Sequence, residues 1–106
     1  MTQDLKLELA EMVAPALWSD LIPHAKRDAI VVVTPQMDLV EVGVAIATDD
    51  VAAVQRWIGE QLIAKPTPEQ LTDWNADARK QLKTLIIQPY VLVQDSLVIA
   101  GEAPDN

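Results

Sequence analysis

Two carboxylates near the middle of the chain, Asp38 and Glu41, are spaced so that they could act together. Residues three apart lie on one face of an α-helix, where a pair of carboxylates could bind a cation or transfer protons. His24, the one histidine of the chain, could add an imidazole to such a site. One hypothesis is therefore a small-ligand or metal-binding enzyme that uses Glu41 with Asp38 or His24.

Helix capping explains the two carboxylates without any ligand. Asp38 followed by Glu41 has the spacing of a capping box, with aspartate in place of the usual serine or threonine. The residues around His24 place it at a helix end, and one histidine cannot form a multi-histidine zinc site. The chain also has no cysteine and no glycine-rich phosphate loop. We therefore predict no catalytic residue, no metal site, no cofactor and no enzyme activity.

The segment from residue 38 to residue 63 predicts two short helices joined by an acidic turn. Asp38 can cap the first helix and Asp49 the second. Apolar residues recur at helical spacing on both sides of the turn, at Leu39, Val42, Ile46, Val51, Val54, Ile58 and Leu62. A strand is the alternative for residues 38–47, because apolar residues also alternate there, and residues 29–47 would then form a β-hairpin.

The rest of the chain predicts short helices and strands in alternation. Helices are expected over residues 2–13, 16–25 and 67–82, and strands over residues 29–33, 63–65 and 85–93, with an extension of the last strand towards residue 100. The third helix has a strong start, because Thr67, Pro68 and Gln70 combine a capping box with proline in the first turn.

The last predicted strand, residues 85–93, suggests a surface for binding another polypeptide. Pro89 has no amide hydrogen, which favours a strand that lies at the edge of its sheet or has a bulge at this residue. An edge strand exposes unpaired backbone groups to a second chain. The side chains expected on this interaction surface are Gln88, Tyr90, Leu92 and Gln94.

These elements predict an α+β fold in a single small domain, residues 1–100, followed by a flexible acidic tail, residues 101–106. The order helix, strand, helix, helix, strand, strand is winged-helix-like, with the helix at Thr67 inserted before the last strand. Sixteen acidic and eight basic residues give a net charge of −8, which repels nucleic acid and anionic membranes. The sequence also has no secretion-like start and no apolar run near the roughly 20 residues of a membrane span, which favours a cytoplasmic protein.

Part of the helix pair resembles helix-turn-helix proteins of the mercury-resistance-regulator type, because Val54, Trp57 and Leu62-Ile63 follow their apolar spacing. This resemblance implies a DNA-binding transcription regulator whose reading helix would present Gln55, Arg56 and Gln61 to base edges. The acidic turn occupies the place of a bound phosphate. DNA binding is therefore the alternative and not the preferred function.

More of the chain resembles a family of small bacterial proteins catalogued as domain of unknown function 2288. The resemblance is carried by MDLVEVGVAIATDD, by the spacing to Arg56-Trp57-Ile58, and by the segments KPTPEQLTDW and QPYVLVQD. It implies a compact bacterial cytoplasmic domain and brings no reaction or ligand with it. The function that we expect is binding of another protein, or of a second copy of the chain, without catalysis.

Overall fold

The computed structural model describes residues 2–95, which form five helices and five strands in one α+β domain. The helices are α1 (Thr2–Met12), α2 (Trp18–Lys26), α3 (Leu39–Ala47), α4 (Val51–Gly59) and α5 (Pro68–Asn75). The strands are β1 (Ala14–Leu17), β2 (Ile30–Val33), β3 (Ile63–Ala64), β4 (Gln81–Ile87) and β5 (Tyr90–Gln94). The predicted α+β class is confirmed, whereas the strand extension towards residue 100 and the acidic tail lie outside the described residues.

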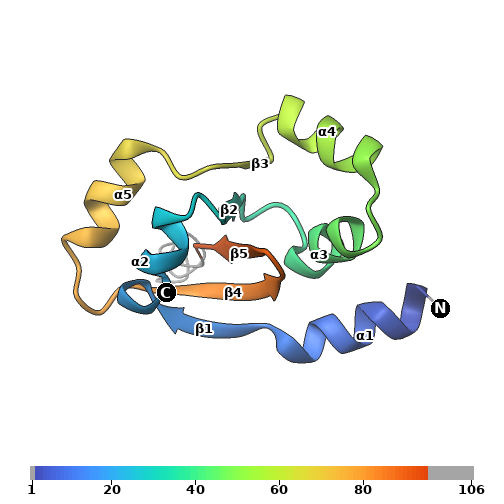
Figure 1. The fold of residues 1–106 in the computed structure, drawn as a ribbon, viewed down its shortest axis with the longest axis horizontal. Coiled ribbons are helices and arrows are strands. Elements are labelled where there is room, and N and C mark those ends of the chain that lie inside the picture. Colours follow the sequence, from blue (N-terminus) through green and yellow to red (C-terminus); the bar gives the residue numbers. More distant parts are fainter. Residues whose placement is uncertain (1, 96–106) are drawn as a thin grey trace, which may run out of the picture.

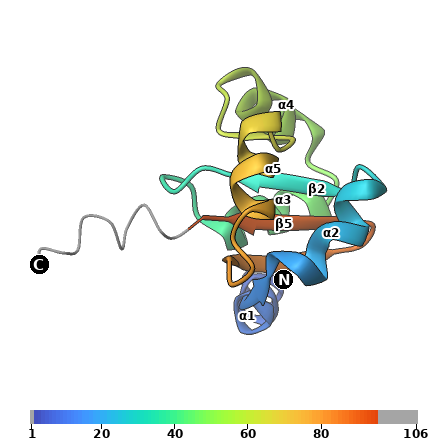
Figure 2. The same cartoon turned by 90° about the vertical axis from the view of Figure 1, so that its left-hand side faces the viewer.

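The five strands form one mixed sheet in the order β1-β4-β5-β2-β3 (Figure 1). β4 and β5 are an antiparallel hairpin at the centre, in which Leu85 lies opposite Leu92. β5 pairs in parallel with β2, and β1 and β3 are the outer strands. Helices cover both faces of the sheet, and Figure 2 shows α2 and α5 in front of β2 and β5, with α3 behind them.

The prediction of a single edge strand over residues 85–93 is wrong. Those residues belong to both arms of the β4–β5 hairpin, and the turn between the arms contains Gln88-Pro89 with a cis peptide bond. A proline without an amide hydrogen fits a turn as well as a sheet edge. β5 lies inside the sheet, because β4 pairs with one side of it and β2 pairs with the other.

Two helix boundaries also differ from the prediction. α5 begins as expected, with a complete capping box in which Thr67 and Gln70 bond each other's backbone at 3.0 Å. It ends at Asn75 and not near residue 82, because Leu82 is on β4, opposite Ala16 of β1. Residues 14–17 are this outer strand β1 and not the start of a helix, so α2 begins at Trp18.

Residues 39–47 form α3, so the predicted helix is confirmed and the alternative β-hairpin over residues 29–47 is wrong. Asp38 starts the helix by accepting a 3.0 Å hydrogen bond from the amide of Val40. The winged-helix arrangement is not confirmed, because the helix pair leads into an outer strand of a five-stranded sheet with helices on both faces.

Buried residues form two cores, one on each face of the sheet. The first core lies under α1 and α3 and contains Leu9, Val33, Leu39, Val42, Ile63, Leu85, Ile87 and Leu92. The second core lies under α2 and α5 and contains Trp18, Leu21, Ile30, Trp74, Leu82, Val91 and Val93. Alternate residues of a strand point to opposite faces, so β4 contributes Leu82 to the second core and Leu85 and Ile87 to the first.

α3 lies unusually close to the sheet at Gly43. A Cβ atom at this position would be 2.6 Å from Cδ2 of Leu85, 3.4 Å from Cδ1 of Leu9 and 3.5 Å from Cδ1 of Ile87. Leu85 is completely buried and therefore has little room to move. Glycine costs helix stability, but here it permits the helix backbone to contact β4.

The second core contains a pair of tryptophans. The rings of Trp18 and Trp74 have centroids 5.0 Å apart and are tilted by 59°. This arrangement of aromatic rings adds stability beyond that gained by burying their surfaces. The indole N–H of Trp18 donates a 2.7 Å hydrogen bond to Oδ1 of Asn75. This bond joins the first residue of α2 to the last residue of α5. Both rings are buried.

Gly43→Ala is expected to lower the free energy of unfolding by about 1–3 kcal/mol through overpacking against Leu85. The better helix propensity of alanine, worth about 1 kcal/mol, offsets only part of this loss. Gly59→Ala is the matched control, because no atom lies within 4 Å of a Cβ there, and it should leave stability unchanged or raise it. Urea denaturation of both variants measures the difference, and equal stabilities would contradict the close packing of α3.

Asn75→Ala is expected to lower the free energy of unfolding by about 0.5–1.5 kcal/mol, because it removes the protein acceptor of the part-buried Trp18 indole N–H. Asn75→Asp keeps an oxygen at the same position and should retain most of the stability. Urea denaturation followed by tryptophan fluorescence distinguishes the two variants. A similar loss of stability in both variants would show that the acceptor oxygen of Asn75 does not stabilise the fold.

Candidate functional site

The connection between α3 and α4 is short and conformationally defined. α3 ends in a Schellman motif, in which the amide of Asp49 bonds to the carbonyl of Ile46 and the amide of Asp50 bonds to the carbonyl of Ala45. Asp49 has a positive φ of 61°, which aspartate tolerates better than most residues. Asp50 then caps α4 through a 3.2 Å bond from the amide of Ala53. The prediction that Asp49 is the cap is therefore wrong by one residue.

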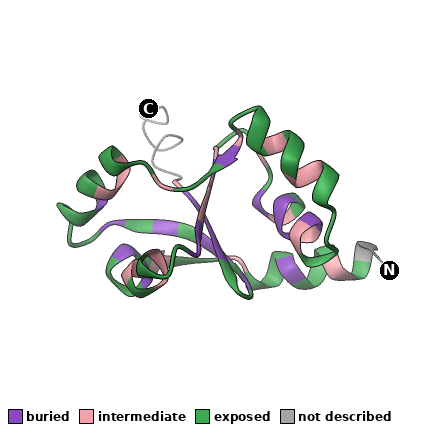
Figure 3. Ribbon diagram, turned by 45° about the horizontal axis from the view of Figure 1, so that its top comes forward, coloured by how far each residue is buried: buried purple, intermediate pink, exposed green. Residues whose placement is uncertain are grey.

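α4 is strongly amphipathic, yet none of its residues is buried, as Figure 3 shows by the absence of purple on this helix. Val51 is 52% exposed and Ile58 is 54% exposed. Val54 and Trp57 are half-buried and pack against the edge of the first core. An apolar helix face normally lies against a core, so α4 leaves part of this face uncovered.

The uncovered face of α4 borders a pocket of about 350 Å³. The pocket lies between the helix pair and the β2–β3 side of the sheet. Its apolar walls are Val31 and Ile63 from the sheet, Ala45 and Ile46 from α3, and Val51, Val54 and Ile58 from α4. Binding sites in proteins commonly have such volumes and mostly apolar walls.

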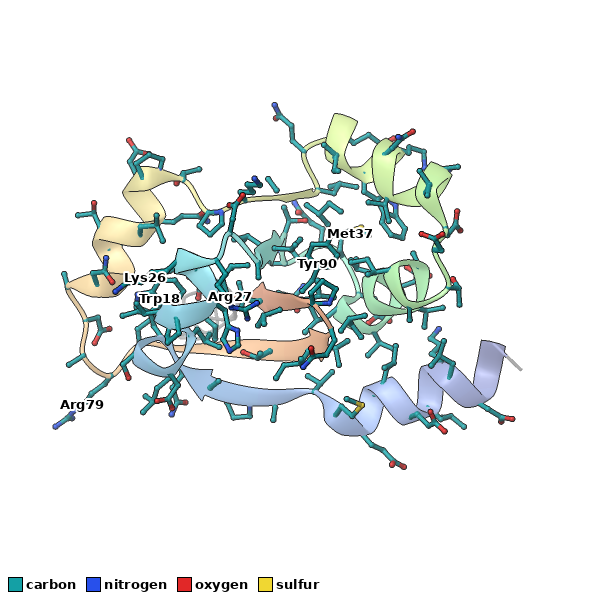
Figure 4. The ribbon with its side chains drawn as sticks, viewed as in Figure 1. Trp18, Lys26, Arg27, Met37, Arg79 and Tyr90 are labelled. Atoms are coloured by element: carbon teal, nitrogen blue, oxygen red, sulfur yellow. The ribbon has the colours of Figure 1, made fainter. Side chains whose placement is uncertain are left out.

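The polar groups of the pocket lie at its rim. Asp49, Asp50 and Lys65 line it, and all three are exposed. Lys65 forms an ion pair of 2.5 Å with Asp28. Tyr90, the first residue of β5, also lines the pocket and is 44% exposed (Figure 4). The site therefore combines an apolar interior with an acidic rim and one exposed aromatic ring.

The predicted interaction surface on residues 85–93 is not an exposed edge. Leu92 is completely buried in the first core. Gln94 is 5% exposed, and its amide donates to the carbonyls of Thr34 at 2.8 Å and Met37 at 2.7 Å. Gln88 is exposed in the hairpin turn. Of the four predicted residues, Tyr90 is the one that the structure brings to the pocket.

The residues of the predicted reading helix do not share one surface element. Gln55 and Arg56 are exposed on α4. Gln61 lies beyond the helix end, with a positive φ of 63° in the Schellman motif that terminates α4. Arg56 is the one cation on α4, so the helix offers little positive charge to a phosphate backbone.

His24 is separated in space from the two candidate carboxylates. Asp38 is the cap of α3, and Glu41 is exposed in the first turn of that helix. His24 lies on α2, which covers the opposite face of the sheet, and its ring contacts Arg27. Within residues 2–95, no three or more histidine, cysteine or acidic side chains are grouped so that they could hold a metal ion. The structure does not bring His24 to the carboxylate pair.

Sequence reasoning missed the pocket itself, although it identified most of the residues that line its helical side. The spacing of Val51, Val54 and Ile58 shows an apolar stripe, but it does not show whether other residues cover that stripe. The walls contributed by Val31 and Ile63 come from β2 and β3, which pair only in the folded sheet. No local signal links these two strands to α4.

Ile58→Ser is expected to change the free energy of unfolding by no more than about 0.5 kcal/mol, because the side chain is largely exposed in the folded protein. Val42→Ala in α3 should cost about 1–3 kcal/mol, because Val42 is completely buried. Urea denaturation of both variants tests this difference. A loss from Ile58→Ser as large as that from Val42→Ala would show that the uncovered face of α4 belongs to the core.

Across residues 2–95 there is no helix long and apolar enough to traverse a bilayer.

Comparison with known proteins identifies relatives of the chain. No match was found among curated protein sequences. The chain is similar to PA1075 from Pseudomonas aeruginosa, known from a solution NMR structure, with a TM-score of 0.74 and 28% identity over 87% of this chain and 84% of that one. Residues 4–95 match the family described as "Protein of unknown function (DUF2288)", and the chain therefore belongs to the DUF2288 family.

Proposed function

We propose that this chain is a protein-interaction domain that acts by binding and not by catalysis, and that the pocket beside α4 receives an apolar side chain of the partner. The observation that carries the proposal is the gathering of exposed apolar residues at one place. Val51, Ile58 and Tyr90 are among the most exposed large apolar side chains of the described residues, and all three line the same pocket. Contiguous exposed apolar surface typically marks a binding site.

The chemistry of the pocket favours binding over a reaction. Its interior walls are aliphatic, and the groups that could transfer a proton, Asp49, Asp50, Lys65 and Tyr90, are all exposed. Catalytic groups work best when they act in a site from which water is excluded. An aliphatic pocket with solvated charges instead resembles the arrangement of an interface, with an apolar centre and a polar rim.

The size of the pocket suits an anchor residue. Complete burial of a Leu, Ile or Phe side chain contributes about 1.5–3 kcal/mol, and interfaces often depend on one or two such anchors surrounded by weaker contacts. Binding would also bury the exposed faces of Val51 and Ile58. A partner segment with one apolar side chain in the pocket therefore fits the proposal.

DNA binding has weaker support from the same surface. Sequence-independent affinity for DNA comes from cations that neutralise phosphates. α4 carries Arg56 as its one cation, and its first turn is preceded by Asp49 and Asp50. The net charge of −8 also disfavours DNA binding. A protein partner without a run of phosphates does not meet this repulsion.

Ile58→Asp is expected to reduce recovery of the partner at least tenfold, because the variant places a carboxylate where an apolar side chain must pack. A penalty of about 1.4 kcal/mol suffices for a tenfold effect, and burying an unpaired polar group costs more than that. Ala52→Asp is the matched control, since Ala52 is exposed on α4, does not line the pocket and acquires the same charge.

The measurement is affinity capture with tagged protein from an extract of the source cells, quantified by mass spectrometry, together with light scattering to detect self-association. The proposal is supported when wild type and Ala52→Asp recover the same protein, or form the same oligomer, and Ile58→Asp does not. Equal recovery by all three proteins, or a monomer without any enriched protein, would contradict it. Circular dichroism confirms that each variant is folded.

A further inference from the structure

The acidic rim of the pocket is held in place by the backbone. Asp49 and Asp50 are consecutive and both are exposed. The positive φ of Asp49 and the Schellman bonds of the α3 terminus define the first residue, and the cap on the amide of Ala53 defines the second. The backbone of both residues and the carboxylate of Asp50 are therefore held in defined positions where α3, α4 and the pocket meet.

These carboxylates determine the sign of the charge at the pocket. Lys65 is the one cation among the residues that line it, and Lys65 is already paired with Asp28 at 2.5 Å. This exposed pair contributes no net charge. The N-terminus of α4 would ordinarily attract an anion, but Asp50 occupies that position and accepts the amide of Ala53. The rim is consequently negative on a chain whose net charge is −8.

We infer that the segment bound by this pocket is basic, with an apolar anchor side chain flanked by at least one Lys or Arg that pairs with Asp49 and Asp50. This inference rests on the proposed function and specifies its partner. The apolar side chain enters between α4 and the sheet, and the cation remains at the solvated rim. An acidic segment with the same anchor meets two like charges and is excluded, because like-charge contacts suppress wrong partners.

The expected strength of the charge contribution is modest. An exposed ion pair changes affinity by about 1.4- to 5-fold, so two pairs together change it by about 2- to 30-fold. Salt screens such exposed pairs, because the Debye length falls from about 10 Å at 0.1 M to about 3 Å at 1 M. The anchor should therefore supply most of the affinity, and the rim should supply the preference for basic segments.

The double variant Asp49→Asn/Asp50→Asn tests the inference without disturbing the turn. Asparagine tolerates positive φ as aspartate does, and it is an equally good helix cap. The variant therefore removes two negative charges and keeps the geometry of the α3–α4 connection. Urea denaturation establishes that its stability matches that of the wild type before any binding is measured.

The probe is a peptide selected from a displayed random library on immobilised wild-type protein, then synthesised in three forms with its flanking residues as Lys, Gln or Glu. Fluorescence anisotropy at 0.05 M and 0.5 M salt measures the affinities. We expect the Lys form to bind about 2- to 30-fold more tightly than the Gln form at low salt, and the Glu form to bind least. The double variant and high salt should each remove this preference and leave the affinity of the Gln form unchanged.

The outcomes separate this inference from the proposed function. Suppose that the peptides bind the wild type more tightly than the Ile58→Asp variant but show no preference for Lys over Glu. The pocket would then remain a binding site, and the inference of a basic partner would be overturned. A failure to select any peptide would contradict both. Self-association that Ile58→Asp abolishes, without any selected peptide, would assign the pocket to a second copy of the chain and overturn the basic segment.

Discussion

The contact between the backbone of α3 at Gly43 and the side chain of Leu85 is the constraint on which the rest of this face depends. Leu85 lies on the central hairpin and is completely buried, so it cannot retreat from the helix. Because the backbone of α3 packs directly against this buried side chain, the helix cannot slide along β4 without a clash. α3 therefore covers the first core together with α1, and the elements that follow α3 are placed relative to that position.

The pocket is a consequence of how α3 ends. A Schellman motif and an immediate cap by Asp50 leave a connection of three residues, so α4 starts beside the end of α3 and has little freedom of direction. α3 already occupies the centre of the sheet face, and α4 is left with the margin above β2 and β3. Its apolar stripe touches the core through Val54 and Trp57 and leaves Val51 and Ile58 beside the pocket.

The two faces of the sheet differ in how completely their apolar residues are covered. On one face, the tryptophan pair and the hydrogen bond to Asn75 join α2 to α5 around a closed core. On the other face, the core under α1 and α3 is closed, but the surface beside it is not. Because the exposed apolar residues lie outside both cores, substitutions there can change recognition while folding depends on other contacts.

The sequence by itself determined features that depend on neighbouring residues: the capped starts of α3 and α5, the strand predicted at residues 29–33 and observed at 30–33, the α+β class, the negative charge and the family. A cap needs only an acceptor and an amide a few residues away. The tertiary structure alone decided that residues 81–94 form a central hairpin, that residues 14–17 join the sheet, and that α4 is half-covered. Alternation and proline show which residues suit a strand or a turn, but not which strands become neighbours. The position of Tyr90 at the pocket therefore depended on β2 pairing with β5, a contact between residues about sixty positions apart.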